Sequence, residues 1–459
     1  MGSSAWRMYR LDRNSLKRYF AFQGARPQCE GNFPRGEPPH EIQVGERFWA
    51  HTTGKQRRTK YYCFPPDVMV AGSCQPIQEC NVGDCVAGVP QSSPIIRTFQ
   101  RQYDGPTVRI NACGIFPIQV TPEHPFLVVT ASWGESRQPI SSWPSLKFSD
   151  PYWKPAKEII PFHNHSPRVN TIRGDCLVMP RTTGNVNSRA IDLTAYMSTR
   201  GRSLITTKQR GITSFPLTTD TAWLLGMYVA EGCLQDKGGK ISGHPAFIIG
   251  RHETRLRQRL CKIIRDLRFR PTVRDTRTAQ MILIPSVVLG RVFPEWCGSG
   301  AKLKRIPSFI LKHQNLSICR GFMDGYWAGD GHWVEHRNMF ESTTVSRRLA
   351  FETQLLLARL GLYGRISIVK IAPKMLEGRF LRGGTAYNVS CTMKQLVKLG
   401  FFVTQDSILV RVKQVDAGQF NGTVYNLETQ NGTYLANNVV VHNCQRHKKL
   451  LYEMGAVPE

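Results

Sequence analysis

The 459-residue sequence is poor in acidic residues, and it lacks long apolar runs. Only 33 Asp and Glu stand against 61 Lys and Arg, which gives a formal net charge of +28. Such an excess is typical of proteins that bind a polyanion, most often nucleic acid, and a basic membrane-surface protein is the main alternative. No apolar run approaches the roughly 20 residues of a spanning helix, and the opening MGSSAWRMYRLDRNSLKRYF lacks the apolar core of a signal peptide. We therefore expect a cytoplasmic protein that spans no membrane.

The cysteine pattern argues against a disulfide framework. The 13 cysteines are odd in number and are scattered over the whole length of a chain without an export signal. The length itself predicts two to four domains. The question becomes which few thiols carry out chemistry.

The stretch VVVHNC near the C-terminus places an imidazole, a carboxamide and a thiol side by side after an apolar run. The side-chain amide of Asn443 can attack its own backbone carbonyl, close a succinimide and expel the amine of Cys444, helped by the tethering of attacker and target. His442 can protonate the leaving nitrogen or polarise the carbonyl, and the Cys444 thiol can accept an acyl group. Alone, the stretch is also compatible with a strand that runs into a polar turn.

A second group of chemically capable residues lies upstream. Cys63 leads into a short apolar strand, and the segment FPIQVTPEHPFLVV places Thr121 and His124 three residues apart between two β-rich runs. A hydroxyl and an imidazole can flank one peptide bond and assist an N-to-S acyl shift at Cys63. Taken singly, Thr121 and His124 are ordinary turn residues.

These features, together with YWKPAKEIIPFHNHSPRVNTIRGDCLVMPR and GTVYNLETQNGTYLANNVVVHNC, resemble in order the splicing blocks of inteins. The resemblance implies an all-β, horseshoe-shaped Hint domain, shared with the hedgehog autoprocessing domain, which would splice itself out of the chain and join Tyr62 to Cys444. It implies these roles: first nucleophile Cys63, activating residues Thr121 and His124, assisting residue His442, cyclising residue Asn443 and second nucleophile Cys444.

The sequence departs from the intein pattern at two places. Asn426 stands where an aspartate is frequent, and Gly432 and Thr433 stand where a further histidine is frequent, so an acid and a proton shuttle are missing. We expect slower splicing rather than none. The rival first nucleophiles are Cys74, Cys80 and Cys85. Cys63 is preferred because the turn VGDCV belongs inside the element, after its first strand.

The interval between the two borders is much longer than splicing blocks require, and two similar nine-residue stretches lie within it. LLGMYVAEG ends in Glu231 before a glycine, and MDGYWAGDG ends in Asp330 before a glycine. Read as helices, each has two small residues four positions apart, which permits close packing, and glycine is an expected helix stop. An acid there is disfavoured by the helix dipole unless a cation is bound. Carboxylates with phosphate oxygens suit Mg²⁺, which supports phosphodiester cleavage.

This pair of stretches resembles the repeated motif of LAGLIDADG homing endonucleases. The resemblance implies that Glu231 and Asp330 bind Mg²⁺, that an α/β pseudo-repeat of the form αββαββ forms saddle-shaped sheets over double-stranded DNA, and that the protein is a pseudo-two-fold monomer. The segment AKLKRIPSF resembles the one whose lysine lies near the metals, which makes Lys304 the candidate, although Lys302 and Arg305 are close by. The arginine-rich helical patterns after each motif predict phosphate contacts.

The expected organisation has five parts: host segment 1–62, first part of the splicing domain 63–190, endonuclease 215–400, second part of the splicing domain 401–443, and host segment 444–459. In the joined host, Cys444 and His447 have the gap of a zinc-ligand pair, with Cys29, His40 and His51 as further candidates, and an exposed basic tail is the alternative.

Two other functions remain open. One is a basic DNA-binding endonuclease that does not splice, and the other is a Hint-type protein that cleaves itself without ligation. The pair Asn443 and Cys444 argues against the second, which needs neither residue.

Overall fold

The computed structural model describes residues 62–133, 146–162, 173–197, 212–237, 240–276, 279–376, 379–381, 383–392 and 400–443. The chain divides into two compact units, of which the first combines residues up to Thr182 with those from Gln395 onward, and the second comprises Thr183–Lys394. The second unit therefore interrupts the first in sequence. Apart from Tyr62, the expected host segments lie outside the described residues, and so do Cys444 and the zinc candidates.

The first unit is built on strands that, within the described residues, form a 13-stranded sheet with the main order β2-β1-β24-β25-β6-β9-β23-β4-β3. Its strands are β1 (Met69–Val70), β2 (Gln75–Pro76), β3 (Cys85–Val86), β4 (Ser93–Ala112), β5 (Ile118–Val120), β6 (Pro125–Trp133), β7 (Leu146–Phe148), β8 (Tyr152–Pro155), β9 (Arg173–Pro180), β22 (Phe401–Val403), β23 (Ser407–Thr429), β24 (Thr433–Ala436) and β25 (Val439–His442). Parts of the long strands β4 and β23 alternate between more and less exposed residues, as half-buried strands do, whereas β24 and β25 are buried at every position.

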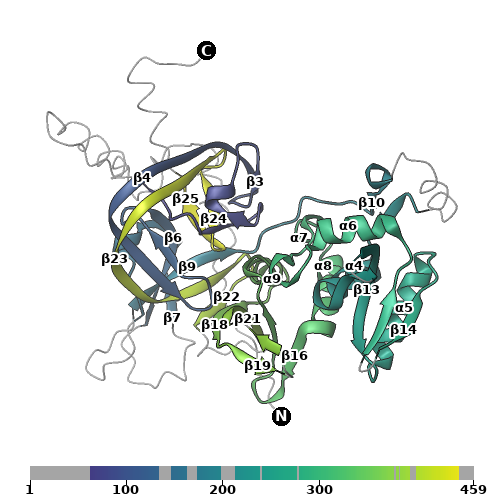
Figure 1. Ribbon diagram of the computed structural model, residues 1–459. Coiled ribbons are helices and arrows are strands. Elements are labelled where there is room, and N and C mark those ends of the chain that lie inside the picture. The colour runs from purple at the N-terminus through teal and green to yellow at the C-terminus, as the bar shows by residue number, and fades with distance from the viewer. Residues whose placement is uncertain are drawn as a thin grey trace, which may run out of the picture. The chain divides into compact units, whose positions relative to one another are not determined.

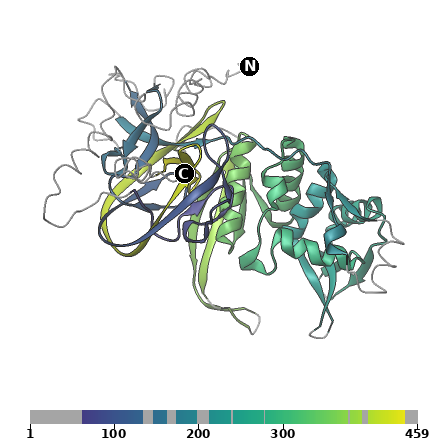
Figure 2. The ribbon, with the colours of Figure 1, turned by 90° about the horizontal axis from the view of Figure 1, so that it is seen from above.

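The two longest strands join the two separated parts of this unit. β4 and β23 pair antiparallel from Ala112 opposite Val412 to Ile95 opposite Thr429, and they form a long curved ribbon (Figure 1 and Figure 2). β24 and β25 form a buried hairpin in which Val441 also pairs with Phe126 of β6. The sheet thus holds the segment around Cys63 and the segment that ends at Asn443 in one β-rich core.

The second unit contains two halves with the same order of elements. The first half is α4 (Thr219–Glu231), β12 (Gly232–Lys237), β13 (Lys240–Gly250), α5 (Thr254–Asp266), β14 (Thr272–Asp275) and β15 (Ala279–Leu283), and the second half is α8 (Leu316–Asp330), β16 (Gly331–Val334), β17 (Met339–Thr344), α9 (Arg347–Arg359), β18 (Gly364–Ile371) and β21 (Gly384–Thr392). Their sheets have the matching orders β12-β13-β15-β14 and β16-β17-β21-β18. The αββαββ repeat expected from the sequence is therefore present in each half.

The remaining elements of the second unit connect these halves or extend them. They are β10 (Ala190–Asp192), β11 (Ser214–Pro216), α6 (Val287–Cys297), α7 (Ser308–Leu311), β19 (Lys374–Leu376) and β20 (Arg379–Leu381). In the described part of the chain, no helix has the length and apolar character that crossing a membrane requires.

Helices α4 and α8 approach each other closely because glycines line their contact. A Cβ atom added at Gly226 would lie 2.1 Å from the carbonyl oxygen of Phe322, and one added at Gly325 would lie 2.0 Å from that of Trp223. Both distances are far below normal contact, so only glycine fits at these two positions. The close approach brings the C-terminal ends of the two helices together.

Candidate functional site

Cys63 lies at the start of the described β-rich unit and is tied to Thr121 through two hydrogen bonds. The backbone N–H of Cys63 donates to Thr121 Oγ1 at 2.9 Å, and the backbone N–H of Thr121 donates to the Cys63 carbonyl at 3.0 Å. Both residues are buried. The Thr121 hydroxyl therefore contacts the nitrogen of the Tyr62–Cys63 peptide bond.

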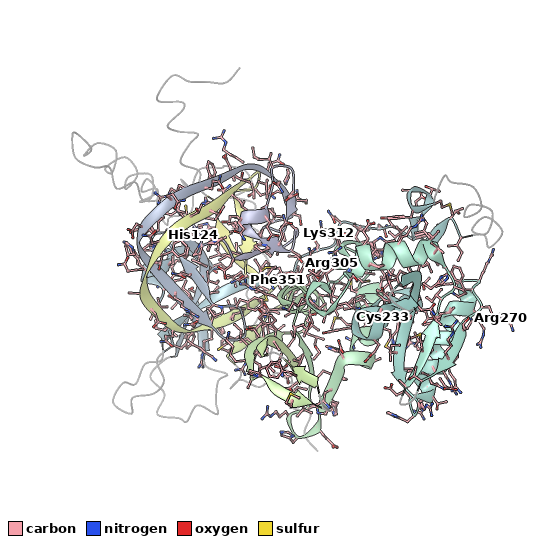
Figure 3. All side chains as sticks on the ribbon, in the orientation of Figure 1. His124, Cys233, Arg270, Arg305, Lys312 and Phe351 are labelled. Atoms are coloured by element: carbon pink, nitrogen blue, oxygen red, sulfur yellow. The ribbon has the colours of Figure 1, made fainter. Side chains whose placement is uncertain are left out.

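His124 lies within the same core, among the strands of the first unit (Figure 3). Its ring is fully buried and packs against Phe64, with ring centroids 4.3 Å apart. Burial, and to a smaller extent the nearby His442, lower the pKa of His124 to about 3, against an opposing contribution from the Tyr62 backbone. The imidazole is therefore neutral at neutral pH, and it lies beside the histidine from the opposite end of the unit.

Asn426 is a site residue whose position the sequence did not predict. Its side-chain Nδ2 donates to the Tyr62 carbonyl oxygen, which belongs to the same peptide bond. Its Oδ1 accepts from the Tyr434 hydroxyl at 2.8 Å and from the Leu427 N–H at 2.7 Å. From the sequence, Asn426 was noted only as a position where an acid is missing. Its contact with Tyr62 depends on the fold, which pairs β23 with the N-terminal segment.

At the other border, His442 contacts the carbonyl oxygen of Asn443. His442 Nδ1 lies 2.7 Å from this oxygen, and because a carbonyl only accepts, Nδ1 carries the hydrogen. Burial lowers the pKa of His442, so the ring is a neutral donor in this contact. A donor at this position can polarise the carbonyl of the Asn443–Cys444 bond, which is the second of the two roles expected for His442. Cys444 itself lies outside the described residues.

The side chain that is expected to cyclise is itself held in place. Asn443 Nδ2 donates to the Thr429 carbonyl at 3.1 Å, and the Asn443 N–H donates to the Gly432 carbonyl at 2.9 Å. The two positions without the frequent histidine have structural roles, because Gly432 adopts a positive φ of 75° and Thr433 Oγ1 accepts from the Val89 N–H at 3.0 Å. Thr433 thus joins β24 to the N-terminal half of the unit.

The rival cysteines have other surroundings. Cys85 lies on β3, where it pairs with Pro94, and Cys74 occupies a turn with a positive φ of 54°. The pKa of the Cys80 thiol is raised, chiefly by burial, which disfavours a thiolate. It is the N–H of Cys63 that reaches the Thr121 hydroxyl.

The second group of candidates lies at the ends of α4 and α8. Glu231 is the last residue of α4 and Asp330 the last of α8. Partial burial raises the pKa of Glu231, and the neighbouring Asp330 and Glu253 carboxylates raise it further. Asp330 reaches solvent, yet lost hydration raises its pKa as well. Two acids that repel each other at the negative ends of two helices are suited to holding a cation.

Lys304 is the buried basic residue beside these acids. Its Nζ donates to the carbonyl oxygens of Tyr228 at 2.6 Å and Gly232 at 2.8 Å, so it caps the C-terminal end of α4. Burial lowers the pKa of Lys304, and both Glu231 and Asp330 oppose this shift. Lys302 is exposed and Arg305 is only partly buried, which separates Lys304 from the two alternatives. Within the described residues, no three His, Cys, Asp or Glu side chains group as a metal site.

The segment that carries Lys304 is held by helix α9 of the second half. Ser346 Oγ donates to the Lys304 carbonyl at 2.7 Å, and the N–H of Ile306 donates to Glu352 Oε2 at 2.6 Å. Glu352 is fully buried and is also bound by Arg348 at 2.7 Å. The second half of the repeat thus positions a lysine that lies beside the end of α4 in the first.

Comparison with known proteins identifies one family and several relatives. The model described as "LAGLIDADG-like domain" matches residues 317–378, which include α8 and Asp330. The ATP-dependent DNA helicase Hel308 of Thermococcus kodakarensis is 26% identical over 84% of this chain and 36% of its own length. The iron-sulfur cluster assembly SufBD family protein Rv1461 of Mycobacterium tuberculosis is 24% identical over 83% of this chain and 43% of its own. The chain thus spans less than half the length of these curated relatives.

Among solved structures, mesophilic variants of the homing endonuclease I-DmoI align with 39% of this chain and 92% of theirs, at 15% identity and a TM-score of 0.29. The family match confirms the resemblance predicted from MDGYWAGDG. The second unit contains a LAGLIDADG-like domain, and Asp330 lies at the end of its motif helix.

Proposed function

We propose that residues 63–443 form a self-splicing element of the intein type, with a Hint-like first unit and a site-specific DNA endonuclease as the second. The observation that carries the splicing proposal is that buried neutral groups contact both borders. Thr121 and Asn426 contact the nitrogen and the oxygen of the Tyr62–Cys63 bond. His442 contacts the carbonyl of the Asn443–Cys444 bond.

The proposed reaction follows from these contacts. The Cys63 sulfur bonds to the Tyr62 carbonyl carbon, the C–N bond of that peptide breaks, and the thiol proton ends on the freed amine, which leaves a thioester. The Cys444 thiol takes over the acyl group by exchange of thioesters. Asn443 Nδ2 then attacks its own carbonyl carbon while His442 polarises the oxygen, and the bond to the Cys444 nitrogen breaks. A shift from sulfur to this free amine joins Tyr62 to Cys444 by a peptide bond.

The curated relatives support an element that is independent of its host. A DNA helicase and an iron-sulfur cluster assembly protein are unrelated in name, yet each aligns with 83–84% of this chain and with less than half of its own length. The interval 63–443 is 381 of 459 residues, or 83% of the chain. A segment shared by otherwise unrelated proteins is what a mobile element predicts.

The endonuclease proposal rests on the second unit. Its paired halves and its LAGLIDADG-like match, together with the net charge of +28 on the whole chain, fit double-stranded DNA as substrate. Glu231 and Asp330 would hold Mg²⁺, which would activate water and stabilise the leaving oxygen when bound. Lys304 sets the end of α4 and supplies positive charge next to both carboxylates.

Mass spectrometry of the full chain tests the splicing proposal. Splicing converts the 52.0 kDa chain into products of roughly 43 kDa and 9 kDa, in proportion to their lengths. The smaller product should contain Tyr62 joined to Cys444. A chain that stays at 52.0 kDa in active buffer contradicts splicing, and separate 1–62 and 444–459 fragments without ligation favour the cleavage-only alternative.

A further inference from the structure

The orientation of the Asn426 side chain is fixed by the groups around it. The Leu427 N–H can only donate, so the Asn426 atom that it faces, at 2.7 Å, is Oδ1. The Tyr434 hydroxyl donates to the same oxygen at 2.8 Å. The other side-chain atom is therefore Nδ2, which can only donate, and it faces the Tyr62 carbonyl oxygen, which can only accept. Nothing in this arrangement depends on choosing between two orientations of the amide.

The contact is partly buried and lies at the atom where charge develops. Asn426 has an exposed fraction of 1%, and Tyr434 has 0%. When the Cys63 sulfur adds to the Tyr62 carbonyl carbon, the π pair of the carbonyl moves to the oxygen and leaves it negatively charged. A fixed N–H donor at that oxygen stabilises the intermediate without reorganising, and such donors are strongest where water is excluded.

We propose that Asn426 is a catalytic residue of the first step, as the donor that stabilises the oxyanion at Tyr62, with Leu427 and Tyr434 as its positioning partners. This inference rests on the proposed splicing function and gives Asn426 a role that an acid could not fill in its ionised form. A carboxylate could accept from Leu427 and Tyr434, but it would present negative charge to the carbonyl oxygen. Asparagine therefore supplies a hydrogen-bond donor at a position where an ionised acid would supply none.

The test isolates thioester formation in the full chain. In an Asn443→Ala background, dithiothreitol cleaves the thioester and releases residues 1–62, and the rate of release is followed by mass spectrometry. Asn426→Ala should slow this release by about 10²–10³-fold, the usual effect of removing one oxyanion donor. Asn426→Asp is the matched variant, because it keeps an acceptor for Leu427 and Tyr434 but replaces the donor by a negative charge. It should slow release similarly at pH 8.

Two further readouts separate catalysis from folding. The ratio of the Asn426→Asp rate to the Asn426 rate should rise as the pH falls, because a protonated carboxyl regains a donor. In a Cys63→Ala background, cleavage after Asn443 should change less than twofold in either variant. The inference is overturned if Asn426→Ala releases residues 1–62 at the parent rate, or if both cleavages slow together. If the Asn443→Ala parent itself releases no fragment, the splicing proposal fails and the inference fails with it.

Discussion

The two candidate sites differ in the kind of polar group that they bury. In the first unit, Thr121, His124 and Asn426 are uncharged. The two peptide bonds that Thr121, Asn426 and His442 contact belong to the same chain. In the second unit, Glu231, Asp330 and Lys304 are ionisable, and their pKa values shift in the directions that burial favours.

Under the two proposed functions, this difference corresponds to where each substrate comes from. A tethered peptide bond arrives without the cost of association, so neutral hydrogen-bond donors that cost little to bury are enough to align it. A DNA phosphate and a metal ion come from solution and carry charge, and charged groups that remain partly hydrated attract them. If the two sites act separately, a change at one site should leave the activity of the other unchanged.

The largest effect is expected from Asn443→Ala. Without the side-chain amide no succinimide forms, so spliced product should vanish and thioester or branched species should accumulate, as seen by mass spectrometry. Asn421→Ala, an exposed position on β23, is the control and should splice normally. DNA cutting should continue in both variants, and loss of cutting in Asn443→Ala would mean that the units do not act separately.

The converse change is Glu231→Gln or Asp330→Asn. Each removes a carboxylate that is proposed to hold Mg²⁺, so Mg²⁺-dependent cleavage of target DNA should be almost abolished, while splicing stays intact. Asp324→Asn on α8, the helix of Asp330, is the control, since Asp324 is exposed and forms an ion pair with Arg320 at 3.7 Å. A gel assay with the cleavage site of an uninterrupted host gene reports cutting. Full cutting by Glu231→Gln would show that this carboxylate does not hold the metal.

A smaller effect, confined to the second unit, is expected from Gly325→Ala. The added methyl group would lie 2.0 Å from the Trp223 carbonyl oxygen, so α4 and α8 must separate, at a cost of about 1–3 kcal/mol in the free energy of unfolding. Gly384→Ala is the matched control, because nothing lies within 4 Å of its added Cβ. Urea unfolding of the two variants measures the difference, and equal midpoints would contradict the close helix contact.

The last prediction is a pH dependence of the stability of the first unit. The pKa of His124 is about 3 in the folded chain against an ordinary 6.5, so the unfolded state takes up a proton first as the pH falls. The free energy of unfolding should therefore decrease between pH 6.5 and 3, by up to about 1.4 kcal/mol per pH unit from this residue. His124→Gln, in a Cys63→Ala, Asn443→Ala background, should flatten the dependence measured by urea unfolding at pH 7 and pH 5. An unchanged slope would mean that His124 is not buried in the neutral form.

Sequence reasoning predicted contacts between neighbouring residues and, through the resemblance to inteins, the pairing of Cys63 with Thr121 across 58 positions. It missed the tertiary contacts that no motif indicates. The two motif helices and the contact of His442 with Asn443 could be expected, because each depends on neighbours in the chain. The contact between Asn426 and Tyr62 spans 364 positions, and no local pattern indicates it. The support of the segment around Lys304 by Ser346 and Glu352 was missed for the same reason, because these contacts join the two halves of the repeat.

The place where the chain leaves and re-enters the first unit has a further consequence. The Arg181 N–H donates to the Asp406 carbonyl at 2.9 Å, and Arg181 Nη1 donates to the Gln405 carbonyl at 2.8 Å. The point where the chain leaves the first unit is thus adjacent to the point where it returns. The cost of closing a loop rises by only about 0.6 kcal/mol for each doubling of loop length. Two adjacent ends can therefore be joined by a short loop or by a whole folded domain at little cost to the stability of the first unit. If the two proposed functions hold, an endonuclease can be gained or lost here without disturbing the splicing residues of the first unit.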